Sequence, residues 1–453
     1  MSGFERPFVR RVAGVLATRV AQFVLGFGSS LIIAKLLGPD GRGAYVAVLL
    51  VPGTLFAIGQ LGVPSAINYF AGRGSSIGDL IRWSFVLTVA FSVVIVGTTL
   101  VLLPFLETNV LRAAPPELLR LVLITVPISC LATFGGSILY GRQAIRTYNW
   151  ILIGQSAASL VGIVVLVGIL GLGVAGAIAT SIIVGLVAAA AIMREVIVVR
   201  RRDPGHEHVA LRSLLDYGLR LYPASVTSYF SYRADVYILQ ALILAPQRAV
   251  GLYSYAVTLA ELVFYIPDSV STIFFPHVAG STAEDSARQV GQVARFTILL
   301  TVCAALALIP AAWVLFAVVL PAFRDSLPAM LILLPGVTSL SLAKVLSSYV
   351  SGRGRPGPVS VAAVIALVVN IIANLLLIPR IGILGASTAS LISYTMHAGI
   401  LLVLTSRLAG RSAASLVVPG REEVRRLDAG MRAIARLLHD RLRPASGAGA
   451  TGP

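Results

Sequence analysis

The stretch IRWSFVLTVAFSVVIVGTTLVLLPF, residues 81–105, decides the class of fold, and Arg82 is its only charged residue. An α-helix rises about 1.5 Å per residue, so this segment is long enough to cross the roughly 30 Å hydrocarbon core of a bilayer. Residues 81–105 are therefore predicted to form a membrane-spanning helix.

Similar apolar stretches recur along almost the whole chain. They predict an all-α polytopic membrane protein with about twelve transmembrane helices. The expected spans lie near residues 12–37, 44–70, 81–105, 118–140, 148–171, 174–199, 212–244, 250–276, 290–319, 327–351, 358–379 and 383–408.

The bulk composition supports this class. The chain has 453 residues, of which 57% are hydrophobic and 12% charged, whereas soluble domains carry about 25% charged residues. Its net charge of +17 comes almost wholly from arginine, since Lys35 and Lys344 are the only lysines. A basic balance fits nucleic acid, a membrane surface or an acidic substrate. Most arginines fall in short loops and the tail, which favours the membrane, and no nucleic-acid partner is expected.

The arginine distribution predicts the orientation, because cytoplasmic loops of membrane proteins are enriched in Lys and Arg. The arginine-rich set of loops includes both ends of the chain, so both termini are predicted to be cytoplasmic in a bacterial inner membrane. The opposite set is sparse and holds only Lys35, Arg42, Arg112, Arg120, Arg248, Arg324 and Arg380.

Short motifs of the first half return in the second half at an offset near 210 residues. Gly43-Ala44-Tyr45 reappears as Gly251-Leu252-Tyr253, and Gly141-Arg142 reappears as Gly352-Arg353. A constant offset with six spans per half predicts two parallel six-helix repeats, a transporter-like arrangement with a site between the halves. The expected divisions are a bundle over residues 1–200, a cytoplasmic linker over 201–211 and a second bundle over 212–410.

The tail differs in kind from the rest of the chain. Within residues 411–444, apolar residues recur every three or four positions between arginines, which predicts a basic amphipathic helix on the anionic cytoplasmic leaflet. A solvated helix packed on cytosolic loops is the alternative. Residues 445–453 are rich in Ala, Ser, Gly, Thr and Pro and are expected to be disordered.

Ionisable residues inside the spans are the strongest candidates for a functional site, because charges within a membrane are costly and usually face a cavity or a partner. Cationic and polar candidates for binding substrate are Arg19, Gln22, Arg220, Arg233 and Lys344. The first and seventh spans correspond in the repeat, and both carry arginines. A guanidinium matches phosphate oxygens, so a cleft lined by these spans would suit an anionic, phosphate-bearing cargo.

Structural alternatives remain open for these residues. Arg233 could pair with Asp235 or Glu261, and Arg19 and Lys344 could extend toward the headgroups. Asp235 and Glu261 could be ion-pairing partners or a proton or cation coupling site.

Nothing in the sequence favours catalysis, a cofactor or a metal. His206-Glu207-His208 lies in the linker without further ligands, and Cys130 and Cys303 fall inside apolar spans as packing residues. No nucleotide-binding loop and no Ser/His/Asp pattern is present, so the protein is not expected to be an enzyme.

Two segments resemble the start of known transporters: residues 18–45, including Ala34-Lys35-Leu36-Leu37-Gly38-Pro39-Asp40-Gly41-Arg42-Gly43, and Gly59-Gln60-Leu61-Gly62. They are similar to bacterial polysaccharide-transport proteins, the oligosaccharide flippases of the multidrug/oligosaccharidyl-lipid/polysaccharide exporter superfamily. The span count and the repeat agree with this family over residues 1–410.

The resemblance implies a V-shaped pair of six-helix bundles that moves undecaprenyl-pyrophosphate-linked sugars from the cytoplasmic to the periplasmic leaflet by alternating access. Cations in the cavity of relatives hold the pyrophosphate, a role that fits Arg19 and then Arg233. Related lipid II flippases carry further arginines near the start of the second span, where only Arg42 comes close, in the turn; this favours a general sugar–lipid cargo. A polysaccharide polymerase or glycosyltransferases of the same pathway are candidate partners.

Two other functions compete with this interpretation. A cation-coupled multidrug antiporter of the same superfamily would use membrane-embedded carboxylates in the first half, where every acid lies in a loop or at a span end, and a positive cleft would repel cationic drugs. A membrane polysaccharide polymerase or glycosyltransferase would need a sizeable extramembrane region, and none is apparent before the tail.

Overall fold

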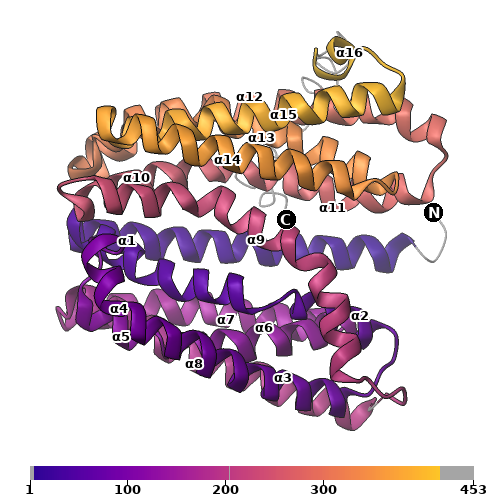
Figure 1. Cartoon of the computed structure of the whole chain (residues 1–453), viewed down its shortest axis with the longest axis horizontal. Coiled ribbons are helices and arrows are strands. Elements are labelled where there is room, and N and C mark those ends of the chain that lie inside the picture. Colours follow the sequence, from indigo (N-terminus) through magenta and orange to yellow (C-terminus); the bar gives the residue numbers. More distant parts are fainter. Residues whose placement is uncertain (1–4, 204, 419–453) are drawn as a thin grey trace, which may run out of the picture. The chain divides into compact units, whose positions relative to one another are not determined.

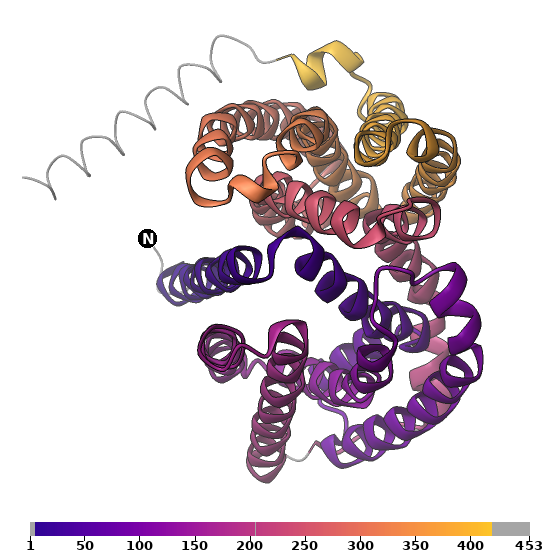
Figure 2. The same cartoon turned by 90° about the vertical axis from the view of Figure 1, so that its left-hand side faces the viewer.

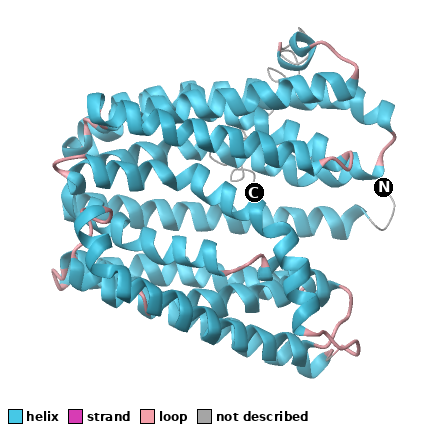
Figure 3. Ribbon diagram, viewed as in Figure 1, coloured by secondary structure: helices cyan, strands magenta, loops and turns pink. Residues whose placement is uncertain are grey.

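The computed structural model describes residues 5–203 and 205–418, and side chains from residue 21 onward within these ranges except those of residues 221 and 224. The described chain is built from helices and short loops (Figure 3), with one isolated bridge between Ser75 and Glu207. The predicted tail helix and the segment 445–453 lie outside the described residues, apart from positions 411–418.

Figure 1 labels the helices in chain order. The first half contains α1 (Glu5–Gly59), α2 (Val63–Gly72), α3 (Ile77–Phe91), α4 (Gly97–Asn109), α5 (Pro116–Val122), α6 (Thr125–Gly141), α7 (Ile145–Ile163) and α8 (Gly173–Arg202). The second half contains α9 (Leu211–Leu242), α10 (Pro246–Ala260), α11 (Tyr265–Gly280), α12 (Ala283–Val314), α13 (Ser326–Gly352), α14 (Pro356–Ile381), α15 (Ile383–Ala409) and α16 (Ala413–Val417). π-helical segments occupy Ser92–Val96, Val164–Ile169 and Leu315–Val319, and 3₁₀ segments occupy Glu261–Phe264 and Pro321–Phe323.

Ten helical stretches of the described residues are long and apolar enough to cross a membrane. One of them, in α1, is a hairpin of two limbs, because the helix reverses at Gly38. α9 has 32 residues and is long enough to span, but its five charged residues separate it from the apolar stretches. Counting both limbs of α1 and adding α9 gives the twelve spans predicted.

The reversal of α1 is tighter than predicted. The sequence predicted a turn over residues 37–43, but only Gly38 leaves the helical conformation, with φ 66° and ψ −174°. Glycine adopts a positive φ without steric cost, and a proline is well suited to a first helical position, so Pro39 starts the second limb at once. The first limb (residues 5–37) is seen nearly end-on in indigo in Figure 2.

The predicted span 44–70 is also interrupted. The second limb (residues 39–59) ends at Gly59, and α2 starts at Val63. Leu61 and Gly62 between them have positive φ values of 47° and 70°. Gly62 faces the carbonyl of Gly218 so closely that a Cβ atom would lie 2.1 Å from its oxygen, which leaves no room for a side chain there.

The linker between α8 and α9 is fastened to the start of α3 and to the end of α6. Arg142 pairs with Asp203 at 2.8 Å, and His208 Nδ1 lies 2.7 Å from an Asp79 carboxylate oxygen. The Ser76 N–H donates to the carbonyl of Glu207 at 2.8 Å. Asp203 and the described part of the linker, residues 205–210, are thus held against these two helices.

The chain divides into two compact units. The first unit comprises the chain up to Leu259 with Ala311–Leu333 and Ala366–Ile392, and the second comprises Ala260–Pro310, Leu334–Ile365 and the chain from Ser393 on. A core of the first unit is formed where α2, α3, α6 and α8 meet, around buried residues such as Ile67, Leu80, Phe134, Ile138 and Val196. The predicted boundary between the repeats, at residues 201–211, stays a prediction.

Large apolar side chains on the outer faces of the helices are exposed. Val93, Val101 and Ile169 are 68%, 79% and 73% exposed. Soluble proteins rarely leave large contiguous apolar surfaces in contact with water, whereas lipid chains are suitable neighbours for them. The protein is a multi-pass membrane protein.

Candidate functional site

The site is organised by a reciprocal contact between the two repeats, inside the first unit. A Cβ atom on Gly43 would lie 1.7 Å from the carbonyl oxygen of Gln247, and one on Gly251 would lie 1.8 Å from that of Pro39. The repeat relates Gly43 to Gly251 and Pro39 to Gln247 with the same offset, since 251 − 43 and 247 − 39 are both 208. The α1 hairpin and the start of α10 therefore pack backbone against backbone.

Arg42 lies beside this contact and is 5% exposed. Its Nη1 donates to the hydroxyl of Ser30 at 2.9 Å, while Nε and Nη2 donate to the hydroxyls of Ser254 and Thr258, each at 3.3 Å. The guanidinium also lies over the Tyr255 ring, 4.4 Å from its centroid. Among the described residues no carboxylate forms an ion pair with Arg42, so the positive charge is buried among neutral partners.

The burial of Arg42 was not predicted from the sequence, which placed it in a turn. The misplaced helix start explains the difference, because α1 resumes at Pro39 and carries Arg42 one turn into the second limb. The pattern that could have revealed it is the proline directly after Gly38, which favours an immediate helix start.

Tyrosines of α9 fasten that helix to the second limb of α1. Tyr237 donates to Thr54 Oγ1 at 2.6 Å, the hydroxyls of Tyr229 and Thr54 lie 2.8 Å apart, and Tyr222 donates to the carbonyl of Ile58 at 2.6 Å. Steps of seven and eight residues place these tyrosines on one helical face. We call this series the tyrosine seam (Tyr222, Tyr229, Tyr237). Its spacing is visible in the sequence, but the sequence did not predict its role in joining α9 to α1.

Arg233 and Asp235 of α9 do not form the ion pair that was one alternative. Asp235 is 4% exposed and accepts hydrogen bonds from the Tyr253 hydroxyl and from the Val236 N–H. Arg233 is half-buried, and no ion pair joins it to Asp235, although both residues are described. Asp235 thus anchors α9 to α10 through Tyr253, and the binding of an anionic cargo by Arg233 stays a prediction.

The remaining predicted residues fall in different environments. Arg220 is largely exposed and pairs with Asp216 at 2.6 Å. Gln22 is half-buried on the first limb of α1, whose helix also contains Arg19, but the Arg19 side chain lies outside the described residues. Glu261 begins the 3₁₀ segment that follows α10 and belongs to the second unit. A coupling site shared by Asp235 and Glu261 stays a prediction.

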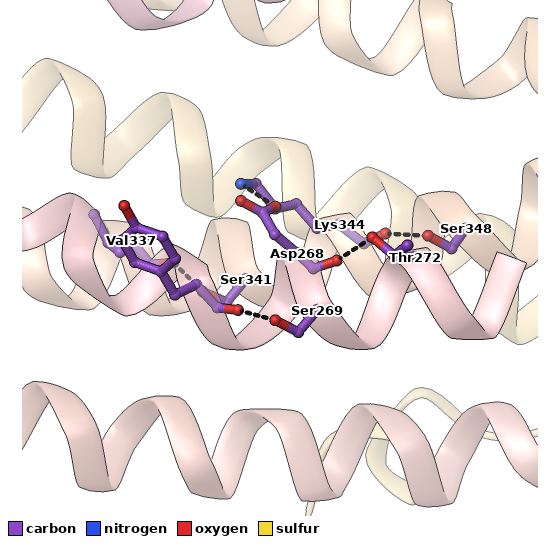
Figure 4. Close-up of polar contacts among 8 residues, drawn as sticks. Asp268, Ser269, Thr272, Val337, Ser341, Lys344 and Ser348 are labelled. Carbon is purple, nitrogen blue, oxygen red and sulfur yellow. Dashed lines mark hydrogen bonds and ion pairs between the residues drawn. The ribbon is translucent and has the colours of Figure 1, made fainter. Parts of the chain in front are cut away.

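Lys344 of α13 pairs with Asp268 of α11 within the second unit (Figure 4). Its ammonium nitrogen lies 2.7 Å from the carboxylate and 4.0 Å from the centroid of the Phe264 ring. This pairing was not predicted, because Lys344 was considered as a substrate contact or as a residue reaching toward the headgroups. The charged candidates of the second half of the chain all have described positions: Arg220, Arg233, Asp235, Glu261 and Lys344.

Comparison with known proteins supports this architecture. No family model matches the chain. A protein of Haloferax volcanii described as a probable low-salt glycan biosynthesis flippase, Agl15, is 26% identical over 191 residues, which cover 41% of this chain and 40% of that protein. The chain thus matches about two-fifths of the length of this curated relative.

Two solved structures resemble the chain over most of its length. The lipid II flippase MurJ in an inward closed conformation has a TM-score of 0.67 and 15% identity, covering 86% of this chain and 87% of that one. A multidrug resistance MATE family transporter of the MOP superfamily, in an inward-facing conformation, has a TM-score of 0.65 and 17% identity, with coverage of 86% and 94%. The chain therefore has the all-helical fold that these two transporters share.

Proposed function

We propose that this chain is a flippase that moves an undecaprenyl-pyrophosphate-linked oligosaccharide from the cytoplasmic to the periplasmic leaflet, in cell-surface polysaccharide biosynthesis. The observation that carries the proposal is Arg42, a guanidinium buried inside a membrane bundle among neutral partners. Charges at such positions are costly and mark substrate or ion pathways. The functions named for the relatives, a glycan biosynthesis flippase and a lipid II flippase, support an anionic lipid-linked cargo.

The hydrogen bonds of Arg42 suit a site that exchanges partners. The hydroxyls of Ser254 and Thr258 donate to backbone carbonyls of α10, at 2.9 and 2.7 Å, while they accept from Arg42. If a phosphate oxygen replaces them, neither hydroxyl loses its own acceptor. Charge-assisted bonds to phosphate are also stronger than bonds between a guanidinium and a neutral hydroxyl. The exchange therefore favours the cargo.

The cationic residues follow one another along the proposed path. Arg19 lies in the first limb of α1, on the side of the predicted cytoplasmic N-terminus, whereas Arg42 lies four residues after the reversal at Gly38, about 6 Å from it along the helix. Arg233 lies nine residues before the end of α9, about 14 Å from it. The pyrophosphate would enter from the cytoplasm, meet these arginines in turn, and leave on the periplasmic side while the lipid tail stays in the bilayer.

The drug antiporter remains the competing function, since the MATE likeness in fold is almost as extensive. A cationic drug would be repelled by Arg42, which has no described acid to neutralise it. A phosphate-bearing cargo is attracted by the same charge. The sign of the buried charge is the reason for preferring the flippase.

The test is a translocation assay with the purified full-length protein in liposomes. A fluorescent polyprenyl-pyrophosphate sugar is supplied, and the accessibility of its head to an external quencher is followed for the wild type and for Arg42→Gln, Arg19→Ala and Arg233→Ala. Arg42→Gln should slow translocation about tenfold or more, because it removes charge-assisted bonds to phosphate. Arg288→Gln is the matched control, since Arg288 pairs with Glu284 on an exposed surface.

Each outcome has a definite meaning. Translocation by the wild type that depends on Arg42 supports the proposal, and unchanged rates in all three variants would refute the phosphate contacts. If the wild type moves no polyprenyl-pyrophosphate sugar but expels cationic dyes in exchange for protons or Na⁺, the antiporter is the correct function.

A further inference from the structure

The second unit contains a charged pair at membrane depth that the proposed path through the first unit does not use. Lys344 lies eight residues before the end of α13, about 12 Å along the helix, and Asp268 lies twelve residues before the end of α11, about 18 Å. Both helices belong to stretches that are long and apolar enough to span the membrane. Both residues therefore lie two turns or more inside helices of membrane-spanning length.

Stability alone is a weak reason for such a pair. Replacing a buried ion pair by apolar residues of similar volume is often neutral or stabilising, because desolvation offsets much of the attraction between the charges. Ionisable residues in membrane segments are accordingly rare and tend to have a functional role.

The two members of the pair are held unequally. Lys344 has a side chain 20% exposed and a second favourable contact, the face of the Phe264 ring at 4.0 Å, through which a cation is attracted to the ring electrons. Asp268 has a side chain 44% exposed. The ammonium is therefore held between the carboxylate and the ring, whereas the carboxylate is the more exposed member of the pair.

Hydroxyl groups surround the pair on both helices, as Figure 4 shows. Ser341 and Ser348 flank Lys344 on α13, and Ser269 and Thr272 follow Asp268 on α11. Each donates to the carbonyl four residues earlier, at 2.7 to 3.0 Å. Such local bonds can be exchanged for an incoming acceptor, since a hydroxyl rotates about its C–O bond.

Ser271 adds an independent sign that a polar partner belongs here. It lies three residues after Asp268 on α11, and residues three apart are neighbours on a helix surface. Its hydroxyl oxygen is buried and has no hydrogen-bond partner among the described residues. Buried polar groups are nearly always satisfied, so an unsatisfied hydroxyl beside a charged pair indicates a partner that the protein alone does not supply.

We propose that Lys344 binds a phosphate or pyrophosphate oxyanion and that Asp268 occupies the place of this anion until the cargo displaces it. This inference rests on the proposed function and adds to it a second anion station in the second unit, with a carboxylate of the protein itself as competitor. Before displacement the Lys344–Asp268 pair has no net charge and therefore attracts anionic headgroups only weakly. After displacement the ammonium and the neighbouring hydroxyls face the oxyanion. Asp268 thereby limits binding to anions that compete with a carboxylate.

The proposal is tested by binding to the full-length protein in nanodiscs of zwitterionic lipid, with fluorescent polyprenyl pyrophosphate as the probe. Lys344→Gln should raise the Kd about tenfold, because one charge-assisted contact is lost. Asp268→Asn should lower the Kd, since the competing anion is removed while the side chain keeps its size. Lys344→Arg should bind nearly as well as the wild type and serves if Lys344→Gln does not fold.

A charge exchange separates a binding site from a merely structural pair. Lys344→Asp combined with Asp268→Lys restores an ion pair, so a structural role predicts that binding and thermal midpoint both return to wild-type values. A binding role predicts that the Kd of the exchanged variant stays well above the wild-type Kd, because the cation has moved away from the Phe264 ring. The same exchange at Glu284 and Arg288, an exposed pair on α12, is the control.

The remaining arms identify the source of the anion and keep this inference separate from the proposed function. Competition by inorganic pyrophosphate would assign the site to the free oxyanion, and a Lys344-dependent Kd without such competition would assign it to the lipid-linked headgroup. An equal loss in Lys344→Gln and Asp268→Asn, or full rescue by the charge exchange, overturns the inference. The flippase proposal is judged separately, by whether the wild type translocates its cargo in liposomes.

Discussion

Two cations inside this membrane protein have different surroundings: Arg42 is buried without an acidic partner, whereas Lys344 is partly exposed and paired with a carboxylate. Arg42, in the first unit, has only hydroxyls, a carbonyl and an aromatic ring as described partners. Lys344, in the second unit, has a carboxylate at 2.7 Å. Under the functions proposed above, the first site would attract an anion through its uncompensated charge, whereas the second would become available only when its own carboxylate is displaced. The difference suggests a capture site and a selective site, and the stability of variants at the two places can separate them.

The largest effect on stability is expected at the backbone contact that holds Arg42 in place. Gly251→Ala would put a Cβ atom 1.8 Å from the carbonyl oxygen of Pro39, so the α1 hairpin and α10 must move apart. Overpacking of this kind costs about 1–3 kcal/mol and more where a backbone has to shift. Circular dichroism during unfolding in detergent should show this loss as a lower free energy of unfolding. Gly26→Ala is the control, since no atom lies within 4 Å of its added Cβ.

A smaller loss of stability is expected when one member of the Lys344–Asp268 pair is removed. Lys344→Met leaves Asp268 without its counter-ion, which should cost about 2 kcal/mol, discounted from the value for fully buried pairs because Asp268 is partly exposed. Adding Asp268→Leu should recover most of this loss. A double variant as unstable as the single one would mean that Lys344 stabilises the second unit mainly by packing, and the comparison with Arg42 would lose its basis.

The sequence predicted the class of fold well because the informative pattern is strong and local. Apolar stretches of membrane length can be recognised without knowledge of tertiary contacts, and ten of them recur as long apolar helical stretches in the described residues. The helix breaks were less accurate. The reversal needs only Gly38, and the break before α2 needs only Leu61 and Gly62. The position of each break therefore depends on the φ angles of one or two residues, whereas composition only indicates a turn somewhere within several residues.

The site was harder to predict, for a physical reason. Whether Arg233 pairs with Asp235 depends on the direction of each side chain around α9, and the structure gives Asp235 to Tyr253 of α10. Lys344 and Asp268 are 76 residues apart, and nothing in their local sequence links them. Charge at membrane depth can be read from one helix, but the partner that neutralises it comes from another.

The tyrosine seam should show an intermediate to small effect. Tyr237→Phe removes the hydrogen bond to Thr54 while keeping the ring, which should cost about 1 kcal/mol. Thr54→Val should cost more, because it also removes the contact with the Tyr229 hydroxyl. The double variant should cost clearly less than the sum of the two single losses, because both single variants remove the Tyr237–Thr54 bond. Thermal unfolding of the three proteins gives the coupling energy. Strict additivity would show that the bond between Tyr237 and Thr54 does not couple α9 to the second limb of α1.

The smallest change in stability is expected for the substitution with the greatest functional effect. Arg42→Met removes a buried charge that has no described acid, so no carboxylate is left unpaired, and the hydroxyls of Ser254 and Thr258 keep their backbone acceptors. The free energy of unfolding should therefore change by less than about 1 kcal/mol, since a well-packed apolar side chain often replaces a buried charge without loss. Translocation of a pyrophosphate-linked cargo should fall sharply in the same preparation. Thermal unfolding and the liposome assay, run in parallel on one sample, measure both quantities. A large loss of stability with translocation per folded molecule unchanged would assign Arg42 to holding α1 against α10, and the anion would then have to be captured elsewhere in the bundle.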